Sequence, residues 1–252
     1  MKKYELTADF ITFSGVKLFR IKALIDFAGV KTGDLGGFIA SENNLSHDGN
    51  AWVHGNARVY GDAWVYGNAW VYGNAWVHGN ARVSGDARVS GDARVYGDAQ
   101  VSGDARVHYN ARVYGNARVY GYARVSGDAQ VHGNAWVHGN AQVYGNAQVY
   151  GDAQVYGNAR VYGNAWVHGD AQVYGNALVS GEADYATIKG FGTVHRTTTF
   201  FRCEDNEIRV NCGCFYGTID QFRKQVEETR EGKIAEEYLL IADLMERHFK
   251  EE

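Results

Sequence analysis

Residues 51–68 read AWVHGN ARVYGD AWVYGN, and the six-residue unit in this stretch decides the fold. Each unit holds alanine, a variable residue, valine, a second variable residue, and a corner of glycine followed by Asn or Asp. The unit returns without insertion or deletion as far as Val179, so that 22 valines stand six residues apart. A fixed period of this kind indicates a repeat architecture, in which each unit buries its apolar side against its neighbours.

The spacing inside the unit predicts a short β-strand. Alanine and valine stand two residues apart, which puts their side chains on one face of a strand. Glycine followed by Asn or Asp tolerates positive φ, so this pair predicts a corner. Three units then close a triangular coil of 18 residues. With coils ~4.8 Å apart, the repeats predict about seven coils and a rod roughly 35 Å long.

A different pattern precedes the repeats. Residues 4–13 and 16–25 alternate apolar and polar types around Ser14-Gly15, which predicts a β-hairpin. We expect this hairpin to cap the first coil of the solenoid.

The segment after the repeats predicts a strand pair over residues 197–203 and 207–215, followed by two helices. Thr218 and Gln221 resemble the capping box that begins a helix, and a second apolar stripe runs to Phe249. We expect these helices to cover the last coil, because a bare strand edge promotes end-to-end assembly. The expected domains are an N-terminal hairpin cap and lead-in at 1–45, a β-helix at 46–188, and a C-terminal cap of a hairpin and two helices at 189–252.

The repeat resembles the hexapeptide of the left-handed β-helix superfamily. The opening GDLGGFI at 33–39 and the closing VNCGCF at 210–215 resemble a little-characterised group of bacterial and phage hexapeptide-repeat proteins, often described as polymer-forming or transferase-like. The resemblance implies an all-β solenoid, a left-handed parallel β-helix with an N-terminal hairpin cap and a small C-terminal α+β cap. It also implies a phage or prophage setting, and it implies no established activity.

Composition narrows the class of protein. The 25 basic and 29 acidic residues give a net charge of −4, and no segment is basic enough to indicate nucleic-acid binding by charge alone. An odd number of cysteines, here three, fits a reducing cytoplasm. No apolar run approaches the ~20 residues of a membrane span, so we expect a cytoplasmic protein that does not contact membranes.

A belt of arginines in the middle coils is the best candidate for a ligand-binding surface. Arginine beside tyrosine is typical of interface hot spots and of phosphate and base recognition. Tyr109 and Tyr122 also break the repeat within this belt, because they replace a corner glycine and a corner Asn or Asp. The candidate residues are Arg82, Arg88, Arg94, Arg106, Arg112, Arg118, Arg124, Tyr96, Tyr109, Tyr114, Tyr120 and Tyr122.

The competing interpretation of this belt is a solvated face. Aspartates at the adjoining corners, such as Asp86, Asp92 and Asp128, are placed to neutralise the arginines locally. Long polar side chains at outward strand positions are also ordinary for a soluble solenoid.

Tryptophans in the first coils are candidates for a contact between subunits. Large apolar side chains on outward positions are costly to leave in water, so we expect the hairpin or a neighbouring subunit to cover them. We expect a homo-oligomer and favour a trimer. The candidate interface residues are Trp52, Trp64, Trp70 and Trp76.

Acyl transfer is the enzymatic alternative, because many left-handed β-helices transfer acyl groups. Those enzymes resemble one another in a catalytic histidine near a loop that breaks the coils, and residues 51–183 contain no such loop. The repeat histidines share one column with Tyr and Ser, as interchangeable surface residues would. We therefore expect no catalytic residue and no cofactor.

Metal binding finds weak support. Ligands must converge, and no two histidines of this column stand in adjacent coils of one face. Cys203, Cys212 and Cys214 are the better metal candidates, although buried structural thiols are the favoured interpretation.

The favoured function is a non-enzymatic β-helix that acts as a scaffold or binding module. The first alternative is a phage-encoded inhibitor of host defence that captures a nucleotide, a nucleic acid or a host protein. The second alternative is a hexapeptide-repeat acyltransferase.

Overall fold

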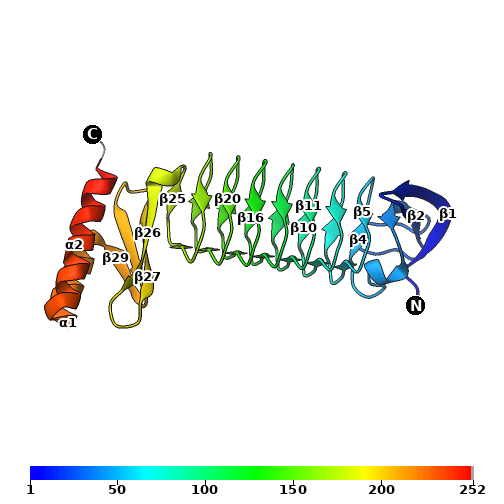
Figure 1. Ribbon diagram of the computed structural model, residues 1–252. Helices are drawn as coiled ribbons and strands as arrows, with labels where there is room; N and C mark the ends of the chain where they lie inside the picture. The colour runs from blue at the N-terminus through cyan, green and yellow to red at the C-terminus, as the bar shows by residue number, and fades with distance from the viewer. Residues whose placement is uncertain (251–252) are drawn as a thin grey trace.

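The computed structural model describes residues 1–250, which form a rod of stacked coils with a small unit at each end (Figure 1). Each strand from β4 (Trp52–Val53) to β25 (Leu178–Val179) consists of a repeat valine and the residue before it. Every third strand belongs to the same parallel sheet, and each residue pairs with the residue 18 positions later, as Arg88 does with Arg106. The predicted 18-residue coil is therefore confirmed.

The interior of the rod is made of the repeat alanines and valines. All 22 valines and the alanines two residues before them have no exposed surface. Backbone amides join each coil to the next, as the Arg88 N–H donates to the Ala105 carbonyl at 2.9 Å. The interior is thus a continuous apolar core inside a wall of backbone hydrogen bonds.

The corners need glycine for two reasons. Gly85 has a φ of +65°, and a β-carbon built there would lie 2.8 Å from the backbone nitrogen of Gly103 in the next coil. Tyr109 takes the same conformation with a φ of 60°, although bulky residues rarely adopt it. This corner therefore carries backbone strain that the other corners avoid.

The solenoid begins one coil earlier than the sequence predicts. Strand β3 (Leu35–Ile39) already pairs in parallel with β5 (Arg58–Val59), and Leu45 bridges Val65. The rod therefore has about eight coils, with short 3-10 helices at Glu42–Asn44 and Glu182–Asp184.

The predicted hairpin is confirmed as β1 (Tyr4–Phe13) and β2 (Val16–Ala23), which pair antiparallel. Strand β2 also pairs antiparallel with β3, so the hairpin extends one sheet of the solenoid beyond the first coil.

The amides of the outward residues donate to the next coil, as that of Arg88 does, so the matching carbonyls of the first coil have no donor from an earlier repeat. The N-terminal unit supplies donors to them. The Lys3 ammonium donates to the Ala51 carbonyl at 2.8 Å, and the Asn44 amide donates to the Ala63 carbonyl at 2.8 Å. Burial lowers the pKa of Lys3 to about 8.

At the last coil the situation is reversed, because the amides of its outward residues have no following coil to accept their hydrogen bonds. The Gln172 N–H donates to the Thr199 hydroxyl at 3.1 Å, and the Ser180 N–H donates to the Asp184 carboxylate at 2.8 Å. The two ends of the rod are therefore closed by chemically opposite side chains.

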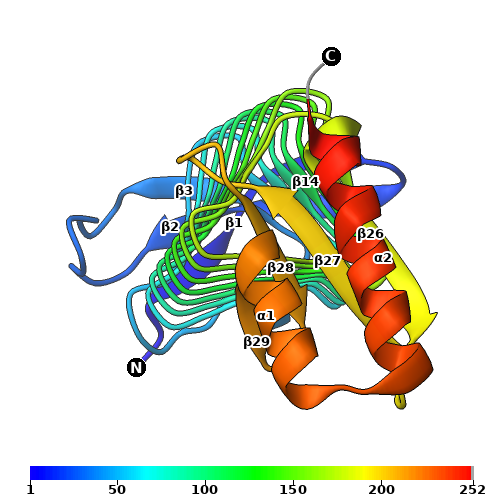
Figure 2. The same ribbon diagram turned by 90° about the vertical axis from the view of Figure 1, so that its left-hand side faces the viewer.

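The C-terminal unit is a four-stranded antiparallel sheet rather than the predicted strand pair. Its strands are β26 (Tyr185–Phe191), β27 (Arg196–Arg202), β28 (Ile208–Cys212) and β29 (Phe215–Thr218). The expected boundary at residue 188 falls inside β26. The sheet lies between the last coil and the helices α1 (Ile219–Thr229) and α2 (Gly232–Phe249), as Figures 1 and 2 show.

The expectation that the helices cover the last coil is therefore wrong. Phe201 on β27 packs into the solenoid core, whereas its neighbour Phe200 packs among the buried residues of the helices. The sheet has two apolar faces and seals the coil with one of them. The capping box is confirmed, because the Gln221 N–H donates to the Thr218 hydroxyl at 3.2 Å. No helix within residues 1–250 combines the length and apolar character needed to cross a membrane.

Candidate functional site: a basic groove on one face of the solenoid

Three of the seven belt arginines stack on one face of the rod. Arg88 on β10 (Arg88–Val89) pairs with Arg106 on β13 (Arg106–Val107), which pairs with Arg124 on β16 (Arg124–Val125). They belong to the eight-stranded sheet that runs from β4 to β25, here called the arginine face. Successive coils thus present the same cationic group three times.

The other four belt arginines lie on the two remaining faces. Arg94 pairs with Arg112 on the sheet that contains β11 (Arg94–Val95) and β14 (Arg112–Val113). Arg82 and Arg118 lie on the third sheet, where Gln100 separates them. The belt is therefore not one surface.

The ion pairs with corner aspartates do not form. Within residues 1–250, no carboxylate lies within 4.0 Å of any of the seven belt arginines. Three of the corner aspartates instead accept hydrogen bonds from asparagines of the preceding coil: Asp92 from Asn74 at 3.1 Å, Asp98 from Asn80 at 2.9 Å and Asp128 from Asn110 at 3.0 Å. The guanidiniums of the arginine face are therefore available to a ligand.

A groove runs beside these arginines. Ser90 stands between Tyr72 and His108 in the column after valine, and its small side chain leaves a hollow. One cavity of about 170 Å³, the arginine groove, is lined by Tyr72, Arg88, Ser90, Arg106, His108 and Arg124. An adjoining cavity of about 350 Å³, the tryptophan pocket, is lined by His54, Trp70, Tyr72 and Arg88. The two cavities share Tyr72 and Arg88.

The side chain of His108 lines the groove and has one polar atom without a partner in the described residues. Its Nδ1 is buried and has no hydrogen-bond partner within residues 1–250. Burial first, and then the charges of Arg124 and Arg106, lower the pKa of His108 below its ordinary value of 6.5. The imidazole is therefore neutral at neutral pH, and a buried polar atom of this kind calls for a ligand or water.

The two residues that break the repeat border this face from opposite corners. Tyr109 lies in the corner that follows β13, where its ring centroid is 4.9 Å from that of His108. Tyr122 lies in the corner that precedes β16. Both side chains are exposed, at 65% and 64%. Tyr109 and Tyr122 thus flank the face that carries Arg88, Arg106 and Arg124, outside the residues that line the arginine groove.

The other candidate tyrosines belong to aromatic stacks elsewhere. Tyr96 and Tyr114 stack at 4.9 Å with nearly parallel rings, within an unbroken column on the second face. This face, from β5 to β23 (Trp166–Val167), is here called the aromatic face. Tyr120 stacks on His138 at 4.7 Å on the third face. The rings of the unbroken column are Tyr60, His78, Tyr96, Tyr114, His132, Tyr150 and His168.

The four candidate tryptophans separate into different environments. Trp52 is buried beneath Phe27, and Trp76 packs against Phe13 at 4.6 Å between ring centroids. The N-terminal unit of the same chain therefore covers both, and buried Trp52 cannot serve a contact between subunits. Trp64 remains 42% exposed, and Trp70 lines the tryptophan pocket.

The three cysteines do not converge. Cys203 is buried in the solenoid core, and burial raises the pKa of its thiol to about 11. Cys212 ends β28 on the helix side of the sheet, whereas Cys214 is exposed in the turn that follows. No group of three or more His, Cys, Asp or Glu residues in the described chain is placed to hold a metal ion.

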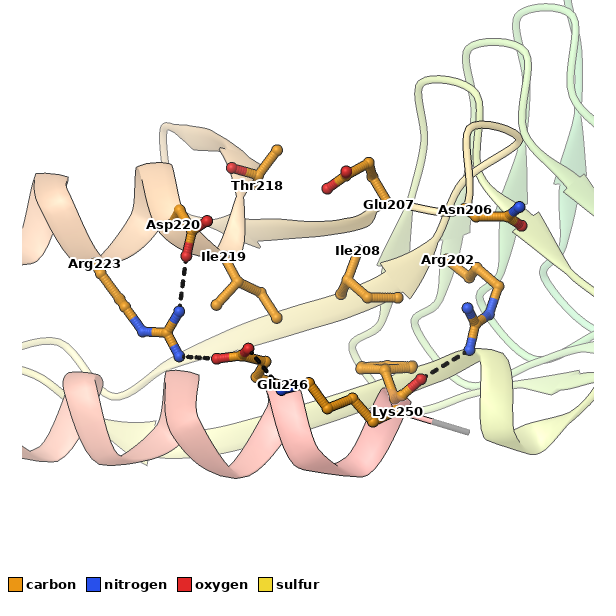
Figure 3. Close-up of a pocket in the computed structure, with 11 residues that line it drawn as sticks. Arg202, Asn206, Glu207, Ile208, Thr218, Ile219, Asp220, Arg223, Glu246 and Lys250 are labelled. Atoms are coloured by element: carbon orange, nitrogen blue, oxygen red, sulfur yellow. Dashed lines mark hydrogen bonds and ion pairs between the residues drawn. The ribbon is translucent and has the colours of Figure 1, made fainter. Parts of the chain in front are cut away.

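A further cavity of about 300 Å³ lies in the C-terminal unit, and its charges are internally paired (Figure 3). Arg223 on α1 contacts Asp220 and Asp243 at 2.8 Å each, and also Glu246. These partners raise the pKa of Arg223. This arginine joins α1 to α2. The other two basic side chains that line the cavity are also paired within residues 1–250, Lys250 with Glu246 at 3.0 Å and Arg202 with Asp184 at 3.4 Å.

Fold and groove together define a repeat β-solenoid with one basic, hollowed face. The chain is similar to the family described as YdcK beta solenoid repeat. The matched segments, all within the solenoid, are residues 63–79, 81–97, 87–103, 111–127, 141–155, 153–169 and 171–183. A search of curated proteins found no match.

Sequence reasoning missed Trp70, Tyr72, Ser90 and His108 as parts of the site. The sequence did hold a signal for them, which is the residue that follows each valine when residues 18 positions apart are compared. On the arginine face the column after valine holds Ser at 90 and 126, where the aromatic face holds only rings.

Proposed function

We propose that this protein is a non-catalytic solenoid binding module that captures a phosphate-bearing anion in the arginine groove. The observation that carries the proposal is the stack of three guanidiniums without carboxylate partners within residues 1–250. Coils lie ~4.8 Å apart, so neighbouring guanidiniums can contact one ligand together. Arginine pairs with phosphate through two parallel hydrogen bonds, and a rigid sheet holds the three groups ready for this.

The placement of the other repeat histidines supports a binding role over catalysis. His132 stacks between Tyr114 at 4.7 Å and Tyr150 at 5.1 Å, and burial lowers its pKa. A ring held between two others has little freedom to act as a base. The coils from β4 to β25 also run without an inserted loop. Turnover of acetyl-coenzyme A would favour the acyltransferase alternative and oppose this proposal.

The anion-binding proposal is tested by titration with inorganic tripolyphosphate. We expect binding that weakens as salt rises, because ions screen exposed charges. The variant Arg88→Gln/Arg106→Gln/Arg124→Gln should lose binding and keep its fold, since Gln142 already occupies the same column. The matched control Arg94→Gln/Arg112→Gln/Arg118→Gln removes equal charge from the other faces and should bind as the parent does. Equal loss in both variants would contradict a site on the arginine face.

Self-association is the second part of the proposal, and α2 supports it better than the tryptophans do. Leu240 and Leu244 are 68% and 57% exposed and stand one helical turn apart on one face. In an antiparallel pair of α2 helices centred on residue 242, Leu240 of one copy meets Leu244 of the other. Glu237 then meets Arg247, so apolar and charged positions are both complementary. This geometry favours a twofold pair over the trimer expected from the sequence.

Light scattering tests the pairing. We expect the parent to form a dimer and Leu240→Glu/Leu244→Glu to be a monomer with unchanged circular dichroism. The control Leu35→Glu changes an exposed leucine, 54% accessible, in the N-terminal unit, and should remain dimeric. A monomeric parent would overturn the pairing and leave the anion site untouched.

A further inference from the structure

The cationic part of the arginine face is bounded at both ends. The coil after Arg124 presents Gln142 in the same column, and the first position of the column is Trp52, which is buried. Arg160, further along, already pairs with Glu204 at 3.0 Å. Three available guanidiniums in a row therefore match a small anion with several charges rather than a long polyanion.

The two cavities differ in chemistry where they meet. The tryptophan pocket is walled by the rings of His54, Trp70 and Tyr72, whereas the arginine groove is walled by guanidiniums and His108. From the coil of Trp70 to the coil of Arg124 there are three coil steps, which is about 14 Å. One ligand can therefore have an aromatic end in the pocket and a multiply charged end in the groove.

We propose that this ligand is a nucleoside polyphosphate that lies along the arginine face. Its base stacks in the tryptophan pocket, because every nucleobase has a flat face that suits an aromatic wall. Its phosphates follow Arg88, Arg106 and Arg124. This inference deepens the proposed function and rests on it.

The remaining features of the face have roles in this arrangement. The neutral imidazole of His108, which lines the groove, offers the phosphates a ring N–H donor beside the guanidiniums. Tyr109 packs beside this imidazole and holds its orientation. Tyr122 lies at the opposite rim, beside the end of the groove where the terminal phosphate lies.

Calorimetric titration with ATP, inorganic tripolyphosphate and adenosine tests the inference. We expect ATP to bind about tenfold or more tighter than tripolyphosphate, because stacking adds to the phosphate contacts. The variant Trp70→Gln should bind tripolyphosphate as the parent does, but it should no longer bind ATP more tightly than tripolyphosphate. Trp64→Gln, which removes an exposed tryptophan from the third face, is the matched control and should still bind ATP more tightly than tripolyphosphate. Circular dichroism establishes that each variant is folded.

The outcomes separate this inference from the proposed function. If ATP and tripolyphosphate bind equally and Trp70→Gln changes neither, the nucleoside part is wrong and the anion site stands. If neither probe binds, both proposals fail. If a twelve-nucleotide single strand binds more tightly than ATP, the bounded-ligand inference is overturned in favour of nucleic acid.

Discussion

The arginine face and the aromatic face share one backbone and one interior, yet they differ in the column of side chains that follows valine. On the aromatic face, seven rings stack without interruption from Tyr60 to His168. On the arginine face, Ser90 and Ser126 interrupt the corresponding column, and Ser90 lines the arginine groove. The two faces thus differ by single side chains in how completely this column is filled.

This difference separates the residues that maintain the rod from those that shape its surface. Alanine, valine and the corner glycine are the same behind both faces, except where Tyr109 replaces the glycine. The two outward positions vary without disturbing the coil. Stability and binding should therefore respond to different substitutions, and the following experiments test that separation.

The largest effect is expected from the interior that both faces share. Val119→Asp places an unpaired carboxylate in the core and should cost roughly 3 kcal/mol or more of unfolding free energy. Arg118→Asp, its neighbour on the same strand, points outward and should cost little. Urea unfolding of both variants measures the contrast, and similar losses would show that the inward and outward assignment is wrong.

Breaking the stack on the aromatic face should cost stability without touching binding. His132→Ser removes ring contacts to Tyr114 and Tyr150, which together are worth roughly 1–3 kcal/mol. The control His54→Ser changes an exposed histidine and should have a smaller effect on unfolding. If His132→Ser unfolds as the parent does, the stack is a consequence of the repeat and not a source of stability.

The opposite change fills the gap on the arginine face. Ser90→Tyr/Ser126→Tyr continues the column through Tyr72 and His108, so it should close the groove. We expect tripolyphosphate affinity to fall about tenfold, or about 1.4 kcal/mol, while thermal stability does not fall. Ser84→Tyr/Ser102→Tyr makes the same change on the third face and should leave affinity intact. Retained affinity in the first variant would place the anion site elsewhere.

Relief of corner strain should have a smaller effect of the opposite sign. Tyr109→Gly restores the residue that positive φ favours and should stabilise the chain by about 1 kcal/mol. Tyr109→Ala removes the ring and keeps the strain, so it should not show this gain. Thermal unfolding compares the two, and equal stability would mean that the corner is not strained.

The smallest expected effect concerns the pH dependence of stability. Replacing two stacked histidines should change it only below neutral pH. Burial lowers the pKa of His78 and of His132 from the ordinary value of 6.5. Their neutral forms therefore favour the folded state. This contribution is complete above pH 6.5 and is lost as the pH falls through the lowered values. His78→Tyr/His132→Tyr should flatten that part of the profile, and an identical slope would contradict it.

The interior and the face assignments could be predicted from the sequence because they depend on a strict period. Eighteen-residue spacing alone places Arg88, Arg106 and Arg124 in one row. The additional coil was missed because β3 and Leu45 join the sheets without the repeat pattern. Strands β26 and β29 were missed for a similar reason, since short strands beside irregular turns carry little periodic signal.

The groove could not be predicted from the arginine column alone. A hollow arises from a difference in side-chain volume between residues 18 positions apart, here Tyr72, Ser90 and His108. The sequence also leaves open whether the guanidiniums are free to bind a ligand. Corner aspartates could pair either with arginine or with asparagine. The structure shows asparagine as the partner of Asp92, Asp98 and Asp128.

The six-residue unit is one third of a coil, and this ratio affects how such a surface can change in evolution. Loss or duplication of the codons for 18 residues would shorten or lengthen every row and leave each face intact. Loss or duplication of six would preserve the interior but rotate all later positions by one third of a turn. Arg106 and Arg124 would then leave the row of Arg88 in a single event. Slippage between near-identical repeats can therefore assemble or dismantle a binding row without one substitution.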